Sequence, residues 1–159
     1  MTGKAKDFVG KDMTAVTPYL YIKDAAKAVG FYEKILGAKT RFKMAGKDGT
    51  IMHCEMTING SPFMLGESNP GMQMPSPKDI GGTASGVCIY VPDVDKTFKD
   101  ALAAGGTEVR PVGDMFWGDR MGCFLDPFGH SWTVATHTED LSDAEIQKRS
   151  DEWMQKNTG

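Results

Sequence analysis

The chain has 159 residues, of which 40% are hydrophobic and 25% are charged, and its formal net charge at pH 7 is −3. These values are typical of a single soluble domain or of two small fused halves. Acidic and basic residues are interspersed, so the sequence offers no electrostatic surface for nucleic acid or for an anionic membrane.

The first residues, MTGKAKDFVGKDM, lack the apolar core of a secretory signal, and no apolar run reaches the length of a membrane span. We therefore expect a cytoplasmic protein with no membrane and no nucleic-acid partner. The three cysteines (Cys54, Cys88 and Cys123) are far apart and form no CxxC pair. They are expected to be reduced, buried thiols.

The chain repeats itself after 69 residues. YIKDAAKAVGFYEKILGAK, from Tyr21, aligns without a gap with YVPDVDKTFKDALAAGGTE, from Tyr90, and identical pairs continue as far as Gly60 and Gly129. Two copies at this spacing indicate pseudo-twofold halves rather than a solenoid. We place the halves at residues 15–68 and 85–138.

Each half predicts a strand, a helix and three more strands. TPYLYI and GVCIYV are the first strands, and Asp24 and Asp93 are the predicted helix N-caps. Glycines end the helices, and Asn59-Gly60 predicts a two-residue hairpin turn between the last two strands of the first half. The prediction is an α+β fold: two βαβββ modules whose curved mixed sheets surround a concave cavity.

Three further segments flank these modules. Residues 1–14 form an N-terminal arm, and residues 69–84 form a linker whose Met72 and Met74 are alternatively a lid over an apolar ligand. Residues 139–159 contain a helix that starts with a Ser142–Glu145 capping box and runs to about Gln155. Trp153 is expected to pack this helix on the body of the protein or on a partner subunit.

Alternation along the strands sorts the side chains between two faces. In IMHCEMTI, His53 and Glu55 point to the cavity, and Met64 lies across the hairpin from Glu55. In the second half the same rule places Phe124 on the cavity side and Cys123 on the helix side. A concave face with few polar groups is typical of a small-molecule site.

The paired modules, with FY in the first helix and DPFGH before the last strand, resemble the PhnB-like branch of the glyoxalase/bleomycin resistance protein/extradiol dioxygenase (vicinal oxygen chelate) superfamily. The resemblance rests on TPYLYIKDAAKAVGFYEKILGA, IMHCEMTINGS, DMFWGDRMGCFLDPFGHSW and ATHTEDLS. It implies the fold and a homodimer, and it leaves the reaction open.

Metal-dependent relatives hold a cation through four strand positions, which the resemblance maps onto Thr17, Met64, Gly86 and Thr133. This set offers none of the imidazole, thiolate or carboxylate ligands that zinc or nickel needs. We therefore expect no metal and no cofactor. His53 and Glu55 remain open to three interpretations: a polar pair in a cavity wall, a ligand contact, or part of an atypical metal site.

The stretch DMFWGDRMG supplies further candidate ligand contacts. Phe116 and Trp117 are suited to stacking on a flat ligand, and Arg120 to holding a carboxylate or phosphate. Alternatively, Asp119 pairs with Arg120 at the module junction while the aromatic rings fill the core. The candidate ligand-binding residues are His53, Glu55, Trp117, Arg120, Phe116, Tyr19 and Phe124, and no catalytic residue is assigned.

Three functions follow as hypotheses. The first is metal-independent binding of a small organic molecule in the cavity. The second is a lyase, isomerase or dioxygenase that uses a metal held atypically by His53 and Glu55. The third is an interaction module that uses the fold alone.

Overall fold

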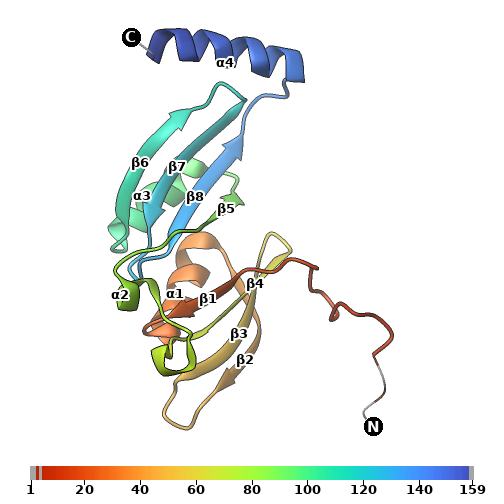
Figure 1. Ribbon diagram of the computed structural model, residues 1–159, viewed down its shortest axis with the longest axis vertical. Helices are drawn as coiled ribbons and strands as arrows, with labels where there is room; N and C mark the ends of the chain where they lie inside the picture. The colour runs from red at the N-terminus through yellow and green to blue at the C-terminus, as the bar shows by residue number, and fades with distance from the viewer. Residues whose placement is uncertain (1–2, 4, 158–159) are drawn as a thin grey trace. The chain divides into compact units, whose positions relative to one another are not determined.

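The computed structural model describes residues 3 and 5–157, and the chain forms two compact units (Figure 1). Unit 1 comprises residues 1–82 and unit 2 comprises residues 83–159. Each unit contains a strand, a helix and three strands in that order, which confirms the predicted α+β fold with two βαβββ modules. Each module forms one four-stranded mixed sheet, and neither sheet is closed.

In unit 1 the sheet has the strand order β1-β4-β3-β2, with β1 parallel to β4 and the other pairs antiparallel. The Asn59-Gly60 turn forms as predicted, and both residues have the positive φ that a tight hairpin requires. The elements are β1 (Tyr19–Ile22), α1 (Ala25–Leu36), β2 (Lys39–Ala45), β3 (Ile51–Ile58) and β4 (Ser61–Glu67).

Unit 2 repeats this arrangement with the strand order β5-β8-β7-β6. Its elements are β5 (Gly86–Tyr90), α3 (Val94–Ala103), β6 (Thr107–Asp114), β7 (Asp119–Leu125), β8 (Ser131–His137) and the C-terminal helix α4 (Asp143–Asn157). The three strands after α3 (β6, β7 and β8) form antiparallel pairs, as β2, β3 and β4 do in unit 1. β5 is parallel to β8, as β1 is to β4.

The two helices begin differently. Asp93 accepts a hydrogen bond from the Lys96 backbone, as an N-cap should. Asp24 does not cap α1: it has a left-handed backbone with φ of 69°, and the Glu67 carboxylate accepts from its N–H and from that of Ala25. Asp24 thus occupies the predicted N-cap position, but its side chain makes no capping hydrogen bond, because the Glu67 carboxylate from the last strand of the module accepts from the first N–H groups.

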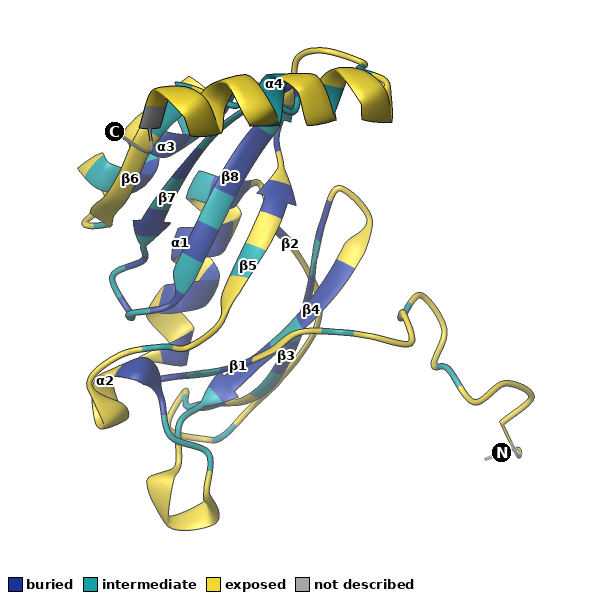
Figure 2. Ribbon diagram, turned by 45° about the horizontal axis from the view of Figure 1, so that its top comes forward, coloured by how far each residue is buried: buried dark blue, intermediate teal, exposed yellow. Residues whose placement is uncertain are grey.

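The core of each unit lies between its sheet and its helix, where the ribbon of Figure 2 is dark blue. In unit 1 the Tyr32 ring of α1 packs edge-on against Phe63 of β4, with 5.8 Å between the centroids. In unit 2 Phe98 of α3 packs in the same way against Phe124 of β7 at 6.1 Å. One face of each sheet is thus covered by a helix, and we call the opposite face the open face.

The segment between the modules is folded into turns rather than extended. It contains a 3-10 turn, η1 (Pro70–Met72), and a short helix, α2 (Pro77–Ile80), which Ser76 and Asp79 cap reciprocally. The backbone of Asn69 pairs with that of Met74, while the Met72 side chain is exposed. The role of the two methionines as a lid stays a prediction.

Helix α4 has no buried residue among those described, and Figure 2 shows it mostly exposed. Ser142 caps its start through the Glu145 N–H, and Trp153 contacts the Phe116 ring at 6.1 Å. No helix in the described part of the chain is long and apolar enough to cross a membrane. Of the cysteines, Cys54 is buried but Cys88 is exposed, which corrects the expectation that all three are buried.

Candidate binding site on the open face of unit 1

Strand register brings Tyr19, Glu55 and His53 together on the open face of unit 1. Tyr19 lies beside Met64, and Met64 lies beside Glu55. Two residues along β3, His53 lies beside Met44 of β2. Residues that are direct neighbours across strands share a face. The predicted orientation of His53 and Glu55 is therefore confirmed, as is the pairing of Glu55 with Met64.

A β-bulge adds a residue that the sequence did not indicate. The register of β2 against β3 shifts between Thr40 and Phe42, so that Arg41 is the extra residue opposite Glu55. Thr40 contacts Glu33 of α1 on the covered face, whereas the Arg41 guanidinium reaches Glu55. Alternation from Thr40 points Arg41 to the open face, and the bulge brings Phe42 to the same face, so both lie opposite Glu55.

A continuous chain of hydrogen bonds crosses the open face. Arg41 donates from Nε and Nη2 to Oε2 of Glu55, at 3.1 and 2.7 Å. Oε1 of the same carboxylate lies 3.5 Å from Nε2 of His53, and Nδ1 of His53 lies 3.1 Å from the Tyr19 hydroxyl oxygen. Arg41 also donates from Nη1 to the Lys11 carbonyl and to Asp12 of the N-terminal arm.

This chain is partly shielded from solvent, and its charges balance. The side chains of His53 and Glu55 are 22% and 18% exposed. The hydrogen bond from Arg41 is the main cause of a lowered pKa at Glu55, so this group is a carboxylate at neutral pH. Burial and the neighbouring Tyr21 raise the pKa of Tyr19, so its hydroxyl is protonated.

Apolar side chains surround these polar groups. The His53 ring lies 5.7 Å from the Tyr19 ring and 6.3 Å from the Phe42 ring, measured between centroids. Tyr19, Phe42 and Met44 are 40%, 51% and 45% exposed. Such a surface, with aromatic groups around a few oriented polar atoms, is typical of sites for small organic molecules.

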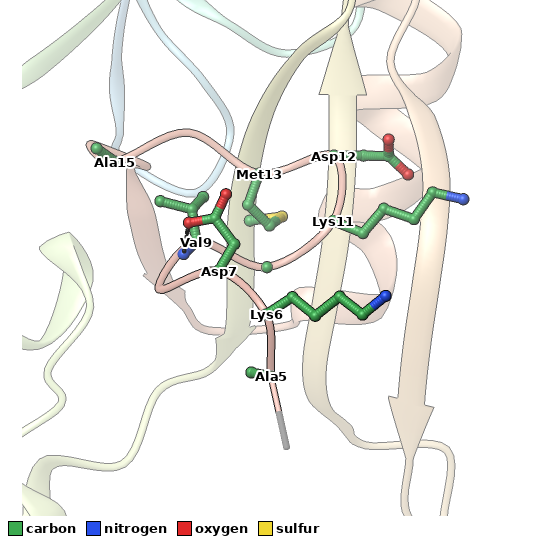
Figure 3. Close-up of a pocket in the computed structure, with 9 residues that line it drawn as sticks. Ala5, Lys6, Asp7, Val9, Lys11, Asp12, Met13 and Ala15 are labelled. Atoms are coloured by element: carbon green, nitrogen blue, oxygen red, sulfur yellow. Dashed lines mark hydrogen bonds between the residues drawn. The ribbon is translucent and has the colours of Figure 1, made fainter. Parts of the chain in front are cut away.

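The N-terminal arm ends beside this surface. Figure 3 shows a pocket of about 690 Å³ that its own residues line, with the side chains of Lys6 and Lys11 pointing away from Val9 and Met13. The bonds from Arg41 to Lys11 and Asp12 fix the arm to β2. None of the candidate residues named from the sequence lines this pocket.

The candidates in unit 2 form separate clusters. Trp117 donates from Nε1 to Asp119, at 3.1 Å, and its ring packs edge-on against Phe116 at 4.8 Å. Asp119 is buried and also accepts from Tyr90 and from His137 Nδ1, at 2.9 and 2.7 Å. These contacts join the loop before β7 to β5 and β8, and they occupy the indole N–H of Trp117.

Arg120 lies on the covered face of unit 2. Its guanidinium makes two hydrogen bonds of 2.8 Å to Asp95 in the first turn of α3, and a third to Asp114. The alternative pairing of Arg120 with Asp119 is therefore wrong, because the two side chains point to opposite faces of β7. The role that these contacts support for Arg120 is to fasten α3 to its sheet.

The predicted orientation of Phe124 is wrong by one residue. Phe124 pairs with Trp132 across β7 and β8, and both are fully buried on the face that α3 covers. Cys123, which was predicted to face the helix, pairs instead with Thr133 on the open face. Phe124 is a core residue packed against Phe98 and does not line the open face.

The family's four metal positions do not fit a transition metal. The Thr17 hydroxyl is bonded to the Thr14 carbonyl, and Gly86, which has no side chain, has the Ser131 side chain against it. Met64 and Thr133 supply a thioether and a hydroxyl, which bind zinc or nickel poorly. Among the described residues no group of three or more His, Cys, Asp or Glu side chains is placed to hold a metal ion.

Known proteins resemble this chain along most of its length. Residues 12–134 match the family model described as Glyoxalase/Bleomycin resistance protein/Dioxygenase superfamily. An uncharacterized protein of Mycobacterium bovis is 38% identical over 136 residues, which cover 84% of this chain and 90% of that protein.

Two solved structures show a similar fold. TioX from Micromonospora sp. ML1 has a TM-score of 0.59 at 24% identity, over 81% of this chain and 100% of that chain. A PhnB protein from Bacillus cereus, described as a putative 3-demethylubiquinone-9 3-methyltransferase, has a TM-score of 0.61 at 20% identity, over 77% of this chain and 99% of that chain. From the match of the family model, the chain belongs to the glyoxalase/bleomycin resistance protein/dioxygenase superfamily.

Proposed function

We propose that this protein binds a small, flat organic molecule on the open face of unit 1, without a metal ion. The observation that carries the proposal is the exposed set of Tyr19, Phe42 and Met44 around a hydrogen-bonded Tyr19–His53–Glu55–Arg41 chain. Apolar rings left exposed beside oriented polar atoms favour a ligand that covers the rings.

The charges of this site argue against the metal-dependent alternative. A cation at Glu55 would have to compete with the Arg41 guanidinium, which already makes two hydrogen bonds to one carboxylate oxygen. Both ring nitrogens of His53 also have protein partners. A lyase, isomerase or dioxygenase working through a metal at this pair would need the whole chain of hydrogen bonds to rearrange.

The site is tested with 2-naphthol, a flat aromatic probe, by calorimetric titration of the purified protein with and without a chelator. We expect saturable binding that the chelator does not change. Phe42→Ala should weaken the affinity about five- to tenfold, because it removes one aromatic wall. Val109→Ala is the matched control, since Val109 is similarly exposed on β6 of unit 2.

Two results would count against the proposal. One is an equal loss of affinity in both variants, which would place the probe elsewhere. The other is a stoichiometric metal ion that is retained by the native protein, lost in His53→Ala and required for binding, which would establish the metal-dependent alternative.

A further inference from the structure

The hydrogen bonds on the open face of unit 1 have a direction that Arg41 fixes. A guanidinium only donates, so Oε2 of Glu55 must accept from it. Glu55 is then a carboxylate, and its other oxygen, Oε1, can only accept as well. The neighbouring His53 nitrogen, Nε2, must therefore carry the proton in the neutral imidazole.

The same reasoning continues to Tyr19. With the proton on Nε2, Nδ1 of neutral His53 has a lone pair and accepts. The Tyr19 hydroxyl, 3.1 Å away, must then donate to it. The opposite tautomer would turn the Nε2 lone pair towards the Glu55 carboxylate, which is repulsive. The protons therefore point towards Glu55 from both ends of the chain, from Tyr19 through His53 on one side and from Arg41 on the other.

This direction determines what the site offers to a ligand. The donors are used within the protein: both His53 nitrogens are engaged, and Arg41 directs four of its five N–H bonds at Glu55, Lys11 and Asp12. Acceptors remain: the Tyr19 oxygen keeps two lone pairs, and Oε1 of Glu55 has only the long 3.5 Å contact.

We infer that the open face of unit 1 selects flat aromatic molecules that carry a hydrogen-bond donor, such as a phenolic hydroxyl or an aromatic N–H, over analogues that lack it. This inference rests on the proposed function, because it specifies the ligand class of the same site. A ligand donor bonds to one of these two acceptors, the Tyr19 oxygen or Oε1 of Glu55, while the ring contacts Tyr19 and Phe42. A methylated analogue has the same ring but leaves the acceptors unpaired.

Three probes with the same ring system test the inference at about pH 8. They are 2-naphthol, 2-methoxynaphthalene and 2-naphthoate, titrated into the full-length protein. We expect 2-naphthol to bind about tenfold more tightly than 2-methoxynaphthalene, which is the effect of one hydrogen bond to a partly buried acceptor. The anionic 2-naphthoate should bind most weakly, because its carboxylate has no hydrogen to donate to the Tyr19 oxygen or to Glu55.

Tyr19→Phe is the informative variant because it keeps the ring and removes the oxygen. The affinity for 2-naphthol should fall about fivefold or more, towards that for 2-methoxynaphthalene, which itself should stay unchanged. Thr57→Val is the matched control: Thr57 lies two residues beyond Glu55 on the same strand and outside the hydrogen-bond chain. Unchanged circular dichroism and melting temperature exclude misfolding of either variant.

The outcomes separate this inference from the proposed function. Equal affinity for 2-naphthol and 2-methoxynaphthalene, with both weakened in Phe42→Ala, would overturn the donor preference and leave the binding site intact. Preferential binding of 2-naphthoate would mean that the fifth N–H of Arg41 recognises the ligand, and would also overturn it. If no probe binds, the proposed function itself fails for aromatic ligands.

Discussion

The Tyr19 hydroxyl reaches His53 only because Gly66 has no side chain. A Cβ atom on Gly66 would lie 3.1 Å from the Tyr19 hydroxyl oxygen and 2.8 Å from the Met52 carbonyl oxygen. Gly66 is the direct neighbour of Tyr21 on β1. The hydroxyl of Tyr19 therefore crosses β4 over a position that any other residue would fill.

We predict that Gly66→Ala displaces the Tyr19 hydroxyl from His53 and destabilises the protein by about 1 kcal/mol, as expected for an overpacked position. The preference for 2-naphthol over its methyl ether should disappear with it. Gly30→Ala is the matched control, because Gly30 lies in α1 with open space around it. That substitution should keep the preference and raise stability, since alanine favours a helix. If Gly66→Ala keeps the native preference for 2-naphthol over its methyl ether, the Tyr19 hydroxyl does not need the space above Gly66 to reach His53.

The faces of β3 were predictable from the sequence, whereas those of β7 were not, and the hairpin loops explain the difference. The two-residue Asn59-Gly60 turn fixes how β3 faces β4. The loop between β7 and β8 has five residues, Asp126 to His130. Residues of β8 therefore correspond to residues of β4 that lie 69 positions earlier, whereas residues of β7 correspond to residues of β3 that lie 68 positions earlier. An ungapped 69-residue alignment equates Cys54 with Cys123, although Gly122 is its structural counterpart.

The remaining parts of the site depended on local irregularities and on tertiary contacts. Arg41 was missed because a period-two pattern does not show which residue of the next strand lies opposite, and the bulge that places both Arg41 and Phe42 opposite Glu55 leaves no signal in it. Arg120 was a candidate because a guanidinium can hold a ligand carboxylate or phosphate, but its partner here is Asp95, which is 25 residues away in the sequence. His53 and Glu55 were placed correctly on one face, because their positions depend only on alternation and on one well-defined turn. Tyr19 was only named as a candidate, since its contact with His53 depends on the pairing of β1 with β4.

A second glycine has a comparable role in the core of unit 2. A Cβ atom on Gly122 would lie 2.9 Å from both the Phe98 ring and the Val112 side chain. We predict that Gly122→Ala destabilises unit 2 by about 1–3 kcal/mol, measured by urea unfolding, because a packed ring cannot move aside freely. The double variant with Phe98→Leu should recover part of this loss. If the single variant has native stability, α3 is less closely packed on β7 than the structure indicates.

Arg120 is predicted to affect stability and not ligand binding. Arg120→Met should lower the urea midpoint of unit 2, because Asp95 and Asp114 lose their shared cation. Its affinity for 2-naphthol should stay within about twofold of native, which corresponds to less than one hydrogen bond. Asp95→Asn is the paired variant, and the two effects on stability should not add, since both remove the same interaction. A marked loss of probe affinity in Arg120→Met would return this residue to the ligand site.

The pair of Asp119 and His137 should make the stability of unit 2 depend on pH. Hydrogen bonds to Asp119 and then to Asp140 raise the pKa of His137. Burial is the largest influence on Asp119 and raises its pKa, but the hydrogen bonds from His137, Tyr90 and Trp117 outweigh it, so the pKa is lowered.

The raised pKa of His137 and the lowered pKa of Asp119 affect stability at different pH values. The contribution of His137 is complete below its unfolded pKa of about 6.5 and is lost as the pH rises through the folded value. The contribution of Asp119 is present above its unfolded pKa of about 4 and is lost as the pH falls through the folded value. The pair therefore stabilises unit 2 most between about pH 4 and 6.5.

Tryptophan fluorescence can follow this effect in one unit alone, since Trp117, Trp132 and Trp153 all lie in unit 2. Relative to His137→Gln, the urea midpoint of the native protein should be highest near pH 6 and should decline towards pH 8, because the imidazolium that Asp119 and Asp140 stabilise is lost. His53→Gln, in unit 1, is the control and should follow the native profile. Parallel profiles for native protein and His137→Gln would show that the two carboxylates do not favour the protonated imidazole in the folded state.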